Sequence, residues 1–352
     1  MLRDVRRQGS VLSGLLGRAD EFLRLGAALA PGAGGRVFAC GCGDGLFAAI
    51  AASAVGAEAG LDWRPIGPLD LILRAPRLRA ADRVVAISMS GNVDRTVEAA
   101  AAAAQAGVPV LALVNGGGGR LGALCPATVS LGIPDEAPFL CGTSSYTGTL
   151  AALILLASGA GGLPALADGL AGVAAAMGRA IAAAEAAVRP ASVPGGVRFL
   201  AAGAEGGTAR YAAAKLVELT QVPAWHADLE EFAHSQYWSM PAGSLVVVVA
   251  TDPVLARYAS DTCDALGQLG IRTFAIEAAS TPVASAALRV SLPDLRPALA
   301  PLLSALPVQW LAYRLATLAG LDPDTRRHLR SDEARFRVSR LLTRRSLVGT
   351  GH

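Results

Sequence analysis

Two short stretches of the sequence carry residue types that could do chemistry. The first is KLVEL at 215–219, in which Lys215 stands three residues before Glu218. Lys215 is the single lysine of the chain, because all the other basic residues among its 31 Lys and Arg are arginine. Residues three apart share one face of a helix, so the ammonium and the carboxylate are expected to meet. Such a pair either orients a reacting group or forms an ordinary surface salt bridge.

The second stretch, SMSGN at 88–92, joins a predicted strand to a predicted helix. Small hydroxyl residues and a glycine at such a junction leave backbone N–H groups at a helix N-terminus, which favours an anion such as phosphate or carboxylate. The alternative is that Ser90 or Asn92 only caps the helix. The spacing leaves both interpretations open.

Short apolar runs alternate with alanine-rich helical stretches along the whole chain. The expected strands are 36–41, 83–88, 108–115 and 127–133, then 197–203, 244–251, 272–278 and 288–293. The expected helices include a pair within 3–29, a single helix at 46–57, and helices at 93–107, 147–158, 210–220 and 253–270. This alternation predicts parallel βαβ units with helices on both faces of each sheet.

The pattern restarts near Val193, so the sequence predicts two copies of one α/β unit. The Pro, Gly and Ser residues of RPASVPGG at 189–196 indicate the boundary. The predicted organisation is a helical segment at 1–30, a first domain at 31–190, and a second domain with a C-terminal helical tail at 191–352.

Composition excludes several classes of protein. With 53% hydrophobic and 17% charged residues over 352 positions, the chain can bury a substantial core and is not disordered. A net charge of +3 argues against a nucleic-acid partner. The five cysteines form no CxxC pair and the four histidines are scattered, which predicts neither a disulfide framework nor a metal site. Without a signal peptide or an apolar run of about 18 residues, a soluble, cytoplasmic protein with no membrane partner is expected.

Four stretches resemble the sugar isomerase (SIS) family. Ser88 to Asn92 followed by Thr96 is similar to the family's phosphosugar loop, SxSGxTxxT, and Ala39-Cys40-Gly41 is similar to its first-strand motif. CGTSSYTGTL at 141–150 and LPVQWLAYRLATLAG at 306–320 are similar to two later family segments. Two such units in tandem resemble the isomerase half of glucosamine-6-phosphate synthase, the fructosamine-6-phosphate deglycases and the amino-sugar-phosphate deaminases. The resemblance covers almost the whole chain and implies two tandem SIS domains, each a doubly wound, flavodoxin-like parallel sheet.

The tightest resemblance lies in the second unit. His234 follows Glu218 by 16 residues, as the corresponding pair does in the synthase-like enzymes, and Glu231 precedes His234 by three. The resemblance implies that Glu218 is the base that moves a proton between C2 and C1 of a sugar, that His234 opens the ring, and that Lys215 orients the substrate. Without the matched spacing, a solvated glutamate and a bystander histidine would be the simpler interpretations.

The resemblance also implies a set of substrate-binding residues and a quaternary structure. The substrate-binding set is Cys42, Ser88, Met89, Ser90, Asn92, Val93, Thr96, Thr143, Ser144, Glu231 and Arg330. No cofactor and no metal are expected. In the family the histidine reaches the neighbouring subunit's site, so a homodimer with shared active sites is expected.

Several family positions are altered in this sequence. Cys42, Met89 and Val93 replace residues that donate hydrogen bonds to the phosphate, and Tyr211 stands where the family has an acidic residue. Phosphate binding could therefore be weaker, rebuilt with Arg95 or arginines of the tail, or directed at another group. Cys42 is either reactive or, more simply, a packing residue.

The tail between positions 326 and 345 contains eight arginines but only one aromatic residue, Phe336. A nucleic-acid site, a solvated helix and a lid over an anionic substrate are all compatible with this composition, the last two more so.

Taken together, these features predict an aldose–ketose isomerase, or a related deaminase or deglycase, that acts on a phosphorylated or otherwise anionic sugar or amino sugar. Two alternatives stay open. One is a sugar-phosphate-binding regulator without catalysis, and the other is a specialised biosynthetic enzyme with an atypical substrate.

Overall fold

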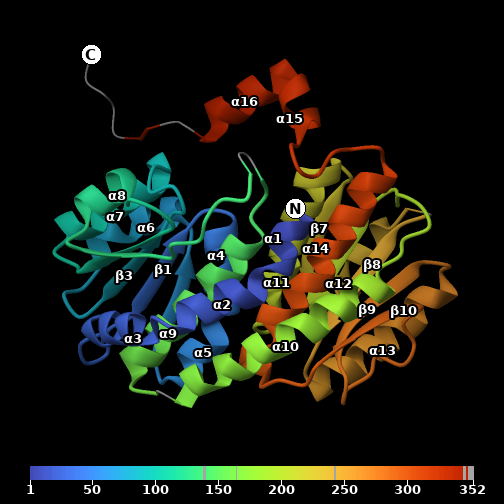
Figure 1. Ribbon diagram of the computed structural model, residues 1–352, viewed down its shortest axis with the longest axis horizontal. Coiled ribbons are helices and arrows are strands. Elements are labelled where there is room, and N and C mark those ends of the chain that lie inside the picture. Colours follow the sequence, from blue (N-terminus) through green and yellow to red (C-terminus); the bar gives the residue numbers. More distant parts are fainter. Residues whose placement is uncertain (138–139, 164, 242, 344–345, 348–352) are drawn as a thin grey trace. The chain divides into compact units, whose positions relative to one another are not determined.

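The computed structural model describes residues 1–137, 140–163, 165–241, 243–343 and 346–347. The chain divides into two compact units (Figure 1). The β1–β5 unit comprises Val11–Asp135, Ser144–Leu170 and Arg327–His352. The β6–β10 unit comprises Met1–Ser10, Glu136–Thr143 and Ala171–Arg326. The predicted domain boundaries at residues 30 and 190 stay a prediction.

The β1–β5 unit is built on one parallel sheet with the strand order β2-β1-β3-β4-β5. Its strands are β1 (Val37–Gly41), β2 (Trp63–Ile66), β3 (Arg83–Ile87), β4 (Val110–Val114) and β5 (Ala127–Ser130). Its helices are α3 (Ala19–Ala28), α4 (Asp44–Ala51), α5 (Ser53–Glu58), α6 (Pro68–Arg74), α7 (Asp94–Gln105), α8 (Gly119–Leu124), α9 (Ser144–Gly161), α15 (Arg327–Ser331) and α16 (Glu333–Thr343).

Alternate residues of each strand in this sheet point to opposite faces, as strand geometry requires. Phe38 and Cys40 of β1 pack with α6, α7 and α8 in one apolar cluster, and α4, α5 and α9 are the helices of the other face (Figure 1). Strands buried on both faces read as continuous apolar runs, and β4 is fully buried along its length.

The β6–β10 unit repeats this topology with the strand order β10-β9-β8-β6-β7. Its strands are β6 (Val197–Ala201), β7 (Ala224–Asp228), β8 (Leu245–Ala250), β9 (Arg272–Ala278) and β10 (Leu288–Leu292). Its helices are α1 (Leu2–Arg6), α11 (Glu205–Thr220), α12 (Leu229–His234), α13 (Pro253–Gln268) and α14 (Pro301–Leu318), with the short turns η2 (Gln236–Ser239) and η3 (Pro297–Leu299). Two further helices, α2 (Gln8–Leu16) and α10 (Ala165–Ala187), each contribute to both units.

Both sheets are parallel, flanked by helices and ordered like a doubly wound, flavodoxin-like fold. This confirms the predicted fold class. In such sheets, ligands bind outside the carboxyl ends of the strands at the point where the strand order reverses. That point lies between β1 and β3 in one sheet and between β6 and β8 in the other.

Some sequence predictions of individual elements were wrong. The helix expected at 46–57 is interrupted at Ala52 and forms α4 and α5. The helix pair expected within 3–29 is three helices, α1 to α3. The edge strands β2 and β7 were not predicted, because each is short and only partly buried.

One stretch of the described residues, Asp168–Ala187 in α10, is long and apolar enough to cross a membrane. A single such helix is weak support for a membrane protein, because core helices of globular proteins pass the same test.

Candidate active site

Lys215 and Glu218 lie on one face of α11, as their spacing predicted. Nζ of Lys215 donates a hydrogen bond to Oε2 of Glu218 at 2.6 Å. The lysine is 4% exposed, so this pair is not the ordinary surface salt bridge of the alternative interpretation. The Glu218 side chain is 27% exposed, so it is only partly buried. A buried ammonium beside a partly exposed glutamate suits an acid–base group better than a solvated pair does.

A second cation holds the same carboxylate. The guanidinium of Arg326 forms an ion pair with Oε1 of Glu218, and its side chain is 8% exposed. Sequence reasoning missed Arg326, because it lies far from Glu218 along the chain and only counted as one of the tail arginines. Its backbone φ of +49° is the one local signal that marks it in the structure.

Tyr211 connects Lys215 to a buried hydrogen-bond chain. Nζ of Lys215 lies 5.7 Å from the Tyr211 ring centroid, within reach of a cation–π contact. The Tyr211 hydroxyl donates to the carbonyl oxygen of Gly142 at 2.7 Å and accepts from Nε2 of Gln309 at 3.1 Å. The side chain that replaces the family's acidic residue is therefore fully buried and ties α11 to the segment at 141–143.

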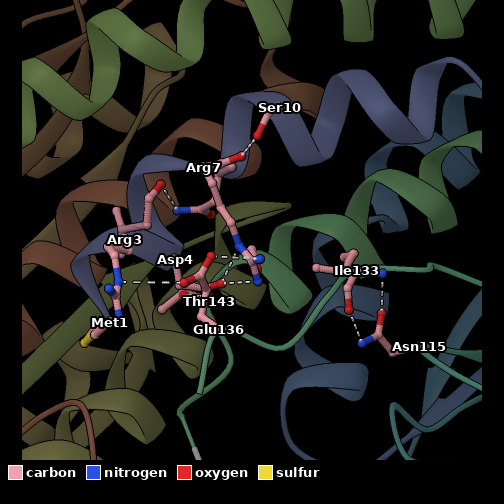
Figure 2. A network of polar contacts seen from close by, with 12 residues as sticks. Met1, Arg3, Asp4, Arg7, Ser10, Asn115, Ile133, Glu136 and Thr143 are labelled. Carbon is pink, nitrogen blue, oxygen red and sulfur yellow. Dashed lines mark hydrogen bonds and ion pairs between the residues drawn. The ribbon is translucent and has the colours of Figure 1, made fainter. Parts of the chain in front are cut away.

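Thr143, a predicted substrate-binding residue, is held by α1. Its buried hydroxyl donates to Oδ2 of Asp4, and Arg7 donates from Nε to Oδ1 of Asp4 at 2.8 Å (Figure 2). Arg7 also pairs with Glu136, Nη1 to Oε1, at 3.0 Å. Asp4 is 4% exposed and holds the Thr143 hydroxyl in place, a role that the sequence did not predict.

His234 and Glu231 lie on α12 in the same unit. Both are exposed, and Nε2 of His234 lies 3.1 Å from Oε1 of Glu230. The hydroxyl of Tyr258 and then His234 hold the pKa of Glu230 below its ordinary value. The structure shows no hydrogen bond or ion pair between His234 and Glu218, so a role for His234 at the Glu218 carboxylate stays a prediction.

The SMSGN loop of the β1–β5 unit follows β3 at the reversal of strand order. Ser88 is 5% exposed, and its buried hydroxyl has no hydrogen-bond partner among the described residues. Gly91 has φ +65°, and a Cβ there would lie 1.9 Å from the carbonyl oxygen of Gly118. Only glycine fits this position, and the turn it makes leads directly into α7. A buried hydroxyl without a partner among the described residues, in the loop before a helix N-terminus, is compatible with a polar or anionic ligand.

Helix α7 receives no side-chain cap, contrary to the alternative interpretation that Ser90 or Asn92 caps it. Its N-cap is Val93, whose side chain offers no hydrogen-bonding group. The Asn92 amide instead braces the loop, donating to the Ser90 carbonyl oxygen at 2.9 Å and accepting from the Arg120 amide at 3.1 Å. Arg120, which the sequence did not single out, also pairs with Asp94 in the first turn of α7.

The remaining predicted residues of this unit surround the same loop. Sγ of Cys42 lies 3.8 Å from Oγ1 of Thr96, and Sδ of Met89 accepts from the Thr149 hydroxyl at 3.5 Å. Burial raises the pKa of the Cys42 thiol, although Thr96 and Arg95 oppose the shift. Cys42 is exposed but mainly protonated at neutral pH, which argues against a reactive thiolate. Ser144 is buried at the start of α9.

Arg95 pairs with Glu98 of α7, and the tail bonds the same carboxylate. Nη1 of Arg95 pairs with Oε2 of Glu98 at 2.5 Å, and the Ser346 hydroxyl donates to Oε1 of Glu98 at 2.6 Å. Burial raises the pKa of Glu98, but these bonds and one from the Leu347 amide bring it below its ordinary value. Arg330 is exposed on α15, and two other tail arginines, Arg344 and Arg345, lie outside the described residues.

Comparison with known proteins places this geometry in a structural family. No profile of a known family matches the sequence, and no curated protein matches it. Among solved structures, the C-terminal domain of glucosamine-fructose-6-phosphate aminotransferase from Francisella tularensis is similar, with a TM-score of 0.78, 18% identity, and coverage of 92% of this chain and 97% of that one.

Two further solved structures are similar over comparable lengths. Tagatose-6-phosphate ketose/aldose isomerase from Escherichia coli has a TM-score of 0.71 and 20% identity, over 92% of this chain and 94% of that one. Glucosamine-6-phosphate deaminase from Thermotoga maritima has a TM-score of 0.72 and 15% identity, over 91% and 96%. The chain has the tandem SIS fold. At these identities the likeness establishes the fold alone.

Within the tandem SIS fold of this chain, the two points of strand-order reversal have diverged. In the β6–β10 unit the corresponding junction holds Glu205, whose fully buried carboxylate accepts hydroxyl hydrogen bonds from Thr208 at 2.6 Å, Ser304 at 2.7 Å and Thr251 at 3.0 Å. Burial raises its pKa, although the three hydroxyl groups oppose the shift. The Glu205 carboxylate thus fills that junction, whereas the Ser88 hydroxyl in the other unit has no hydrogen-bond partner among the described residues.

Proposed function

We propose that this chain is an aldose–ketose isomerase, or an isomerase-type deaminase or deglycase, for a phosphorylated or otherwise anionic sugar or amino sugar. The observation that carries the proposal is the buried Lys215 bonded to the partly exposed Glu218 on α11. The fold is shared with a ketose/aldose isomerase and a glucosamine-6-phosphate deaminase, which supports this reaction class.

The proposed chemistry is a proton transfer between neighbouring carbons. The carboxylate of Glu218 takes the proton from C2 of the open-chain aldose, and the C2–H electron pair forms the C1–C2 double bond of an enediol as the carbonyl oxygen gains a proton. Glu218 then returns its proton to C1, and loss of the O–H proton at C2 restores a carbonyl there, which gives the ketose. Lys215 donates to the oxygen that gains negative charge in this step.

Two further roles complete the proposed reaction. His234 moves a proton between the anomeric hydroxyl and the ring oxygen to open the sugar, a task for which imidazole titrates in a useful range. The loop from Ser88 to Thr96, with its unpaired Ser88 hydroxyl and the uncapped N-terminus of α7, receives the anionic group. The other predicted substrate-binding residues, Cys42 and Ser144 among them, remain proposals, as do Glu231 and Arg330.

The quaternary structure and location are also proposals. His234 is exposed and bonds Glu230 rather than Glu218. This agrees with a homodimer in which His234 serves the site of the partner subunit. A cytoplasmic enzyme without cofactor or metal agrees with the residue types that the proposed reaction uses.

A second candidate function is a sugar-phosphate-binding regulator. The observation that favours it is that cations hold both oxygens of Glu218, which lowers the carboxylate's readiness to accept a proton. Cys42, Met89 and Val93 stand where the family has hydrogen-bond donors to the phosphate. The loss of these donors would equally suit a biosynthetic enzyme with an atypical anionic substrate.

Incubation of the protein in deuterium oxide with a panel of sugar phosphates tests these proposals. The panel consists of fructose 6-phosphate, tagatose 6-phosphate, glucosamine 6-phosphate and their aldose or ketose partners. An isomerase incorporates deuterium at C2 or C1 and interconverts one pair, and a deaminase also releases ammonia. A shift in the thermal unfolding midpoint without exchange would instead identify the regulator.

A further inference from the structure

Lys215 bonds one carboxylate oxygen of Glu218, the proposed base, and Arg326 pairs with the other. Its guanidinium pairs with Oε1 of Glu218, while Lys215 bonds Oε2 at 2.6 Å. Each carboxylate oxygen therefore faces a cation. Oε1 keeps a second lone pair, but the nearby guanidinium charge lowers the basicity of the carboxylate. Oε1 therefore becomes the stronger base for a proton on carbon once the guanidinium moves.

The two cations are held in different ways. Lys215 is buried within α11, where the helix fixes its backbone. Arg326 lies in the connection after α14, and its φ of +49° is in the left-handed region that side chains with a Cβ disfavour. The Arg326 amide bonds the carbonyl oxygen of Asp322 at 3.0 Å, at the end of a short turn. Arg326 is therefore the cation that can withdraw, because rotation out of this backbone conformation relieves strain.

We propose that Arg326 is a displaceable cation that controls the proposed base and selects anionic sugars. It holds Oε1 of Glu218 until the anionic group of a substrate pairs with the guanidinium, and this transfer frees Oε1 for the proton at C2. Guanidinium groups form strong paired bonds to phosphate, so a phosphorylated sugar can compete with the carboxylate, whereas a neutral sugar cannot. The inference rests on the proposed function, since it adds a specificity-determining residue to the same site.

Steady-state kinetics of Arg326→Ala test the proposal, with Arg327→Ala as the matched control. Arg327 is the exposed neighbouring arginine at the start of α15, and its loss changes the net charge equally. In Arg326→Ala, KM for fructose 6-phosphate is expected to rise by about tenfold or more, as for a lost charge-assisted bond. Arg326→Ala is expected to exchange deuterium into neutral fructose at least as fast as wild type does, because the Glu218 carboxylate is no longer paired with a guanidinium.

A structural role for Arg326 gives another result. Both sugars would then lose turnover in parallel, and the thermal unfolding midpoint would fall, which would overturn the proposal. Arg326→Lys keeps a charge without the planar fork, so its KM for fructose 6-phosphate should lie between those of wild type and Arg326→Ala. A KM for Arg326→Lys no better than that of Arg326→Ala would also contradict the proposal.

The single lysine allows a test that does not depend on turnover. Wild-type protein grown with lysine labelled by carbon-13 at Cε has one lysine side-chain resonance, that of Lys215. Inorganic phosphate and fructose 6-phosphate should shift this resonance as Arg326 leaves Glu218, fructose should not, and the phosphate effect should vanish in Arg326→Ala. No shift in wild type, or an equal shift in Arg326→Ala, would overturn the proposal. A phosphate-dependent shift without deuterium exchange on any sugar would refute only the proposed enzymatic function.

Discussion

A single carboxylate with two different cationic partners is the central feature at the scale of residues. Lys215 contributes a compact ammonium that can bond Oε2 of Glu218 and a substrate oxygen from one position, supported from below by the Tyr211 ring. A planar guanidinium at position 215 would demand another geometry in a buried space. Under the proposed function, this requirement accounts for the one lysine in a chain whose other basic residues are arginine.

Lys215→Arg should therefore lower kcat by about tenfold or more, although the charge is kept, because the fork of the guanidinium misplaces the donor. The thermal unfolding midpoint should be measured on the same sample. Wild-type kcat in Lys215→Arg would show that the lysine is structural and that our account of α11 is wrong.

At the scale of elements, the junction between β3 and α7 shapes the proposed anion site. Gly91 allows the chain to turn against the backbone of Gly118. Beside this turn lie the buried Ser88 hydroxyl, which has no partner among the described residues, and the end of α7 that has no side-chain cap. The loop is held by backbone bonds and by the Arg120 amide, which donates to the Asn92 side chain, rather than by a side-chain cap on α7.

Gly91→Ala should destabilise the fold by roughly 2 kcal/mol or more and abolish phosphate binding, because a Cβ would overlap the Gly118 carbonyl. Gly116→Ala is the control, since a Cβ at Gly116 meets no atom within 4 Å. The change at Gly116 should stay within about 0.5 kcal/mol. Urea unfolding and phosphate titration measure both quantities, and similar stabilities for the two variants would refute the steric explanation.

The starts of β1 and β3 are joined by the buried carboxylate of Asp82. It accepts bonds from the Arg36 amide at 3.0 Å, the Arg36 guanidinium at 2.6 Å and the Arg79 amide at 2.9 Å. Burial alone would raise the pKa of Asp82. The bonds from Arg36 and from the two amides lower it by more, so the resulting pKa is about 2. The folded-state pKa lies below the ordinary value of 3.8, so this stabilisation is complete above pH 3.8 and is lost as the pH falls toward 2.

Asp82→Asn should cost about 3 kcal/mol at neutral pH, because it leaves Arg36 without its buried partner. The difference from wild type should shrink as the pH falls through the window below 3.8. Urea unfolding at several pH values measures it. A difference that does not change with pH would show that the cost comes from packing rather than from the ion pair.

The sequence predicted the elements with strong apolar patterns and missed those without them. The fully buried strands β4 and β8 read as uninterrupted apolar runs. Strand β2, WRPI, contains proline and charge, and β7, AWHAD, is polar at alternate positions, because both lie at sheet edges. Local spacing placed Lys215 against Glu218, but Arg326 meets Glu218 only through the tertiary fold, which no local pattern records.

At the scale of the whole molecule, the chain consists of two units with one topology and different junctions. One junction is filled by the Glu205 carboxylate, and the other holds the buried Ser88 hydroxyl, which has no hydrogen-bond partner among the described residues. The proposed base lies in the β6–β10 unit and the proposed anion loop in the β1–β5 unit.

If the protein is a homodimer with shared sites, inactive variants should complement one another. Glu218→Gln and His234→Ala should each be inactive alone, and their mixture should recover roughly a quarter of wild-type activity after subunit exchange, since half of the dimers then contain one intact site. Activity assays on the separate and mixed variants measure this. No recovery, with mixed dimers shown by mass spectrometry, would mean that His234 serves its own chain or no site.

Deuterium exchange by Glu218→Gln tests the central claim most directly. Wild type, Glu218→Gln and the control Glu185→Gln, which alters an exposed carboxylate of α10 paired with Arg6, are incubated with the sugar phosphate that wild type exchanges fastest. Our account predicts equal exchange in wild type and Glu185→Gln, and a loss of about a thousandfold in folded Glu218→Gln, as for removal of a general base. Exchange at the wild-type rate in Glu218→Gln, or no exchange by wild type on any sugar of the panel, would contradict it.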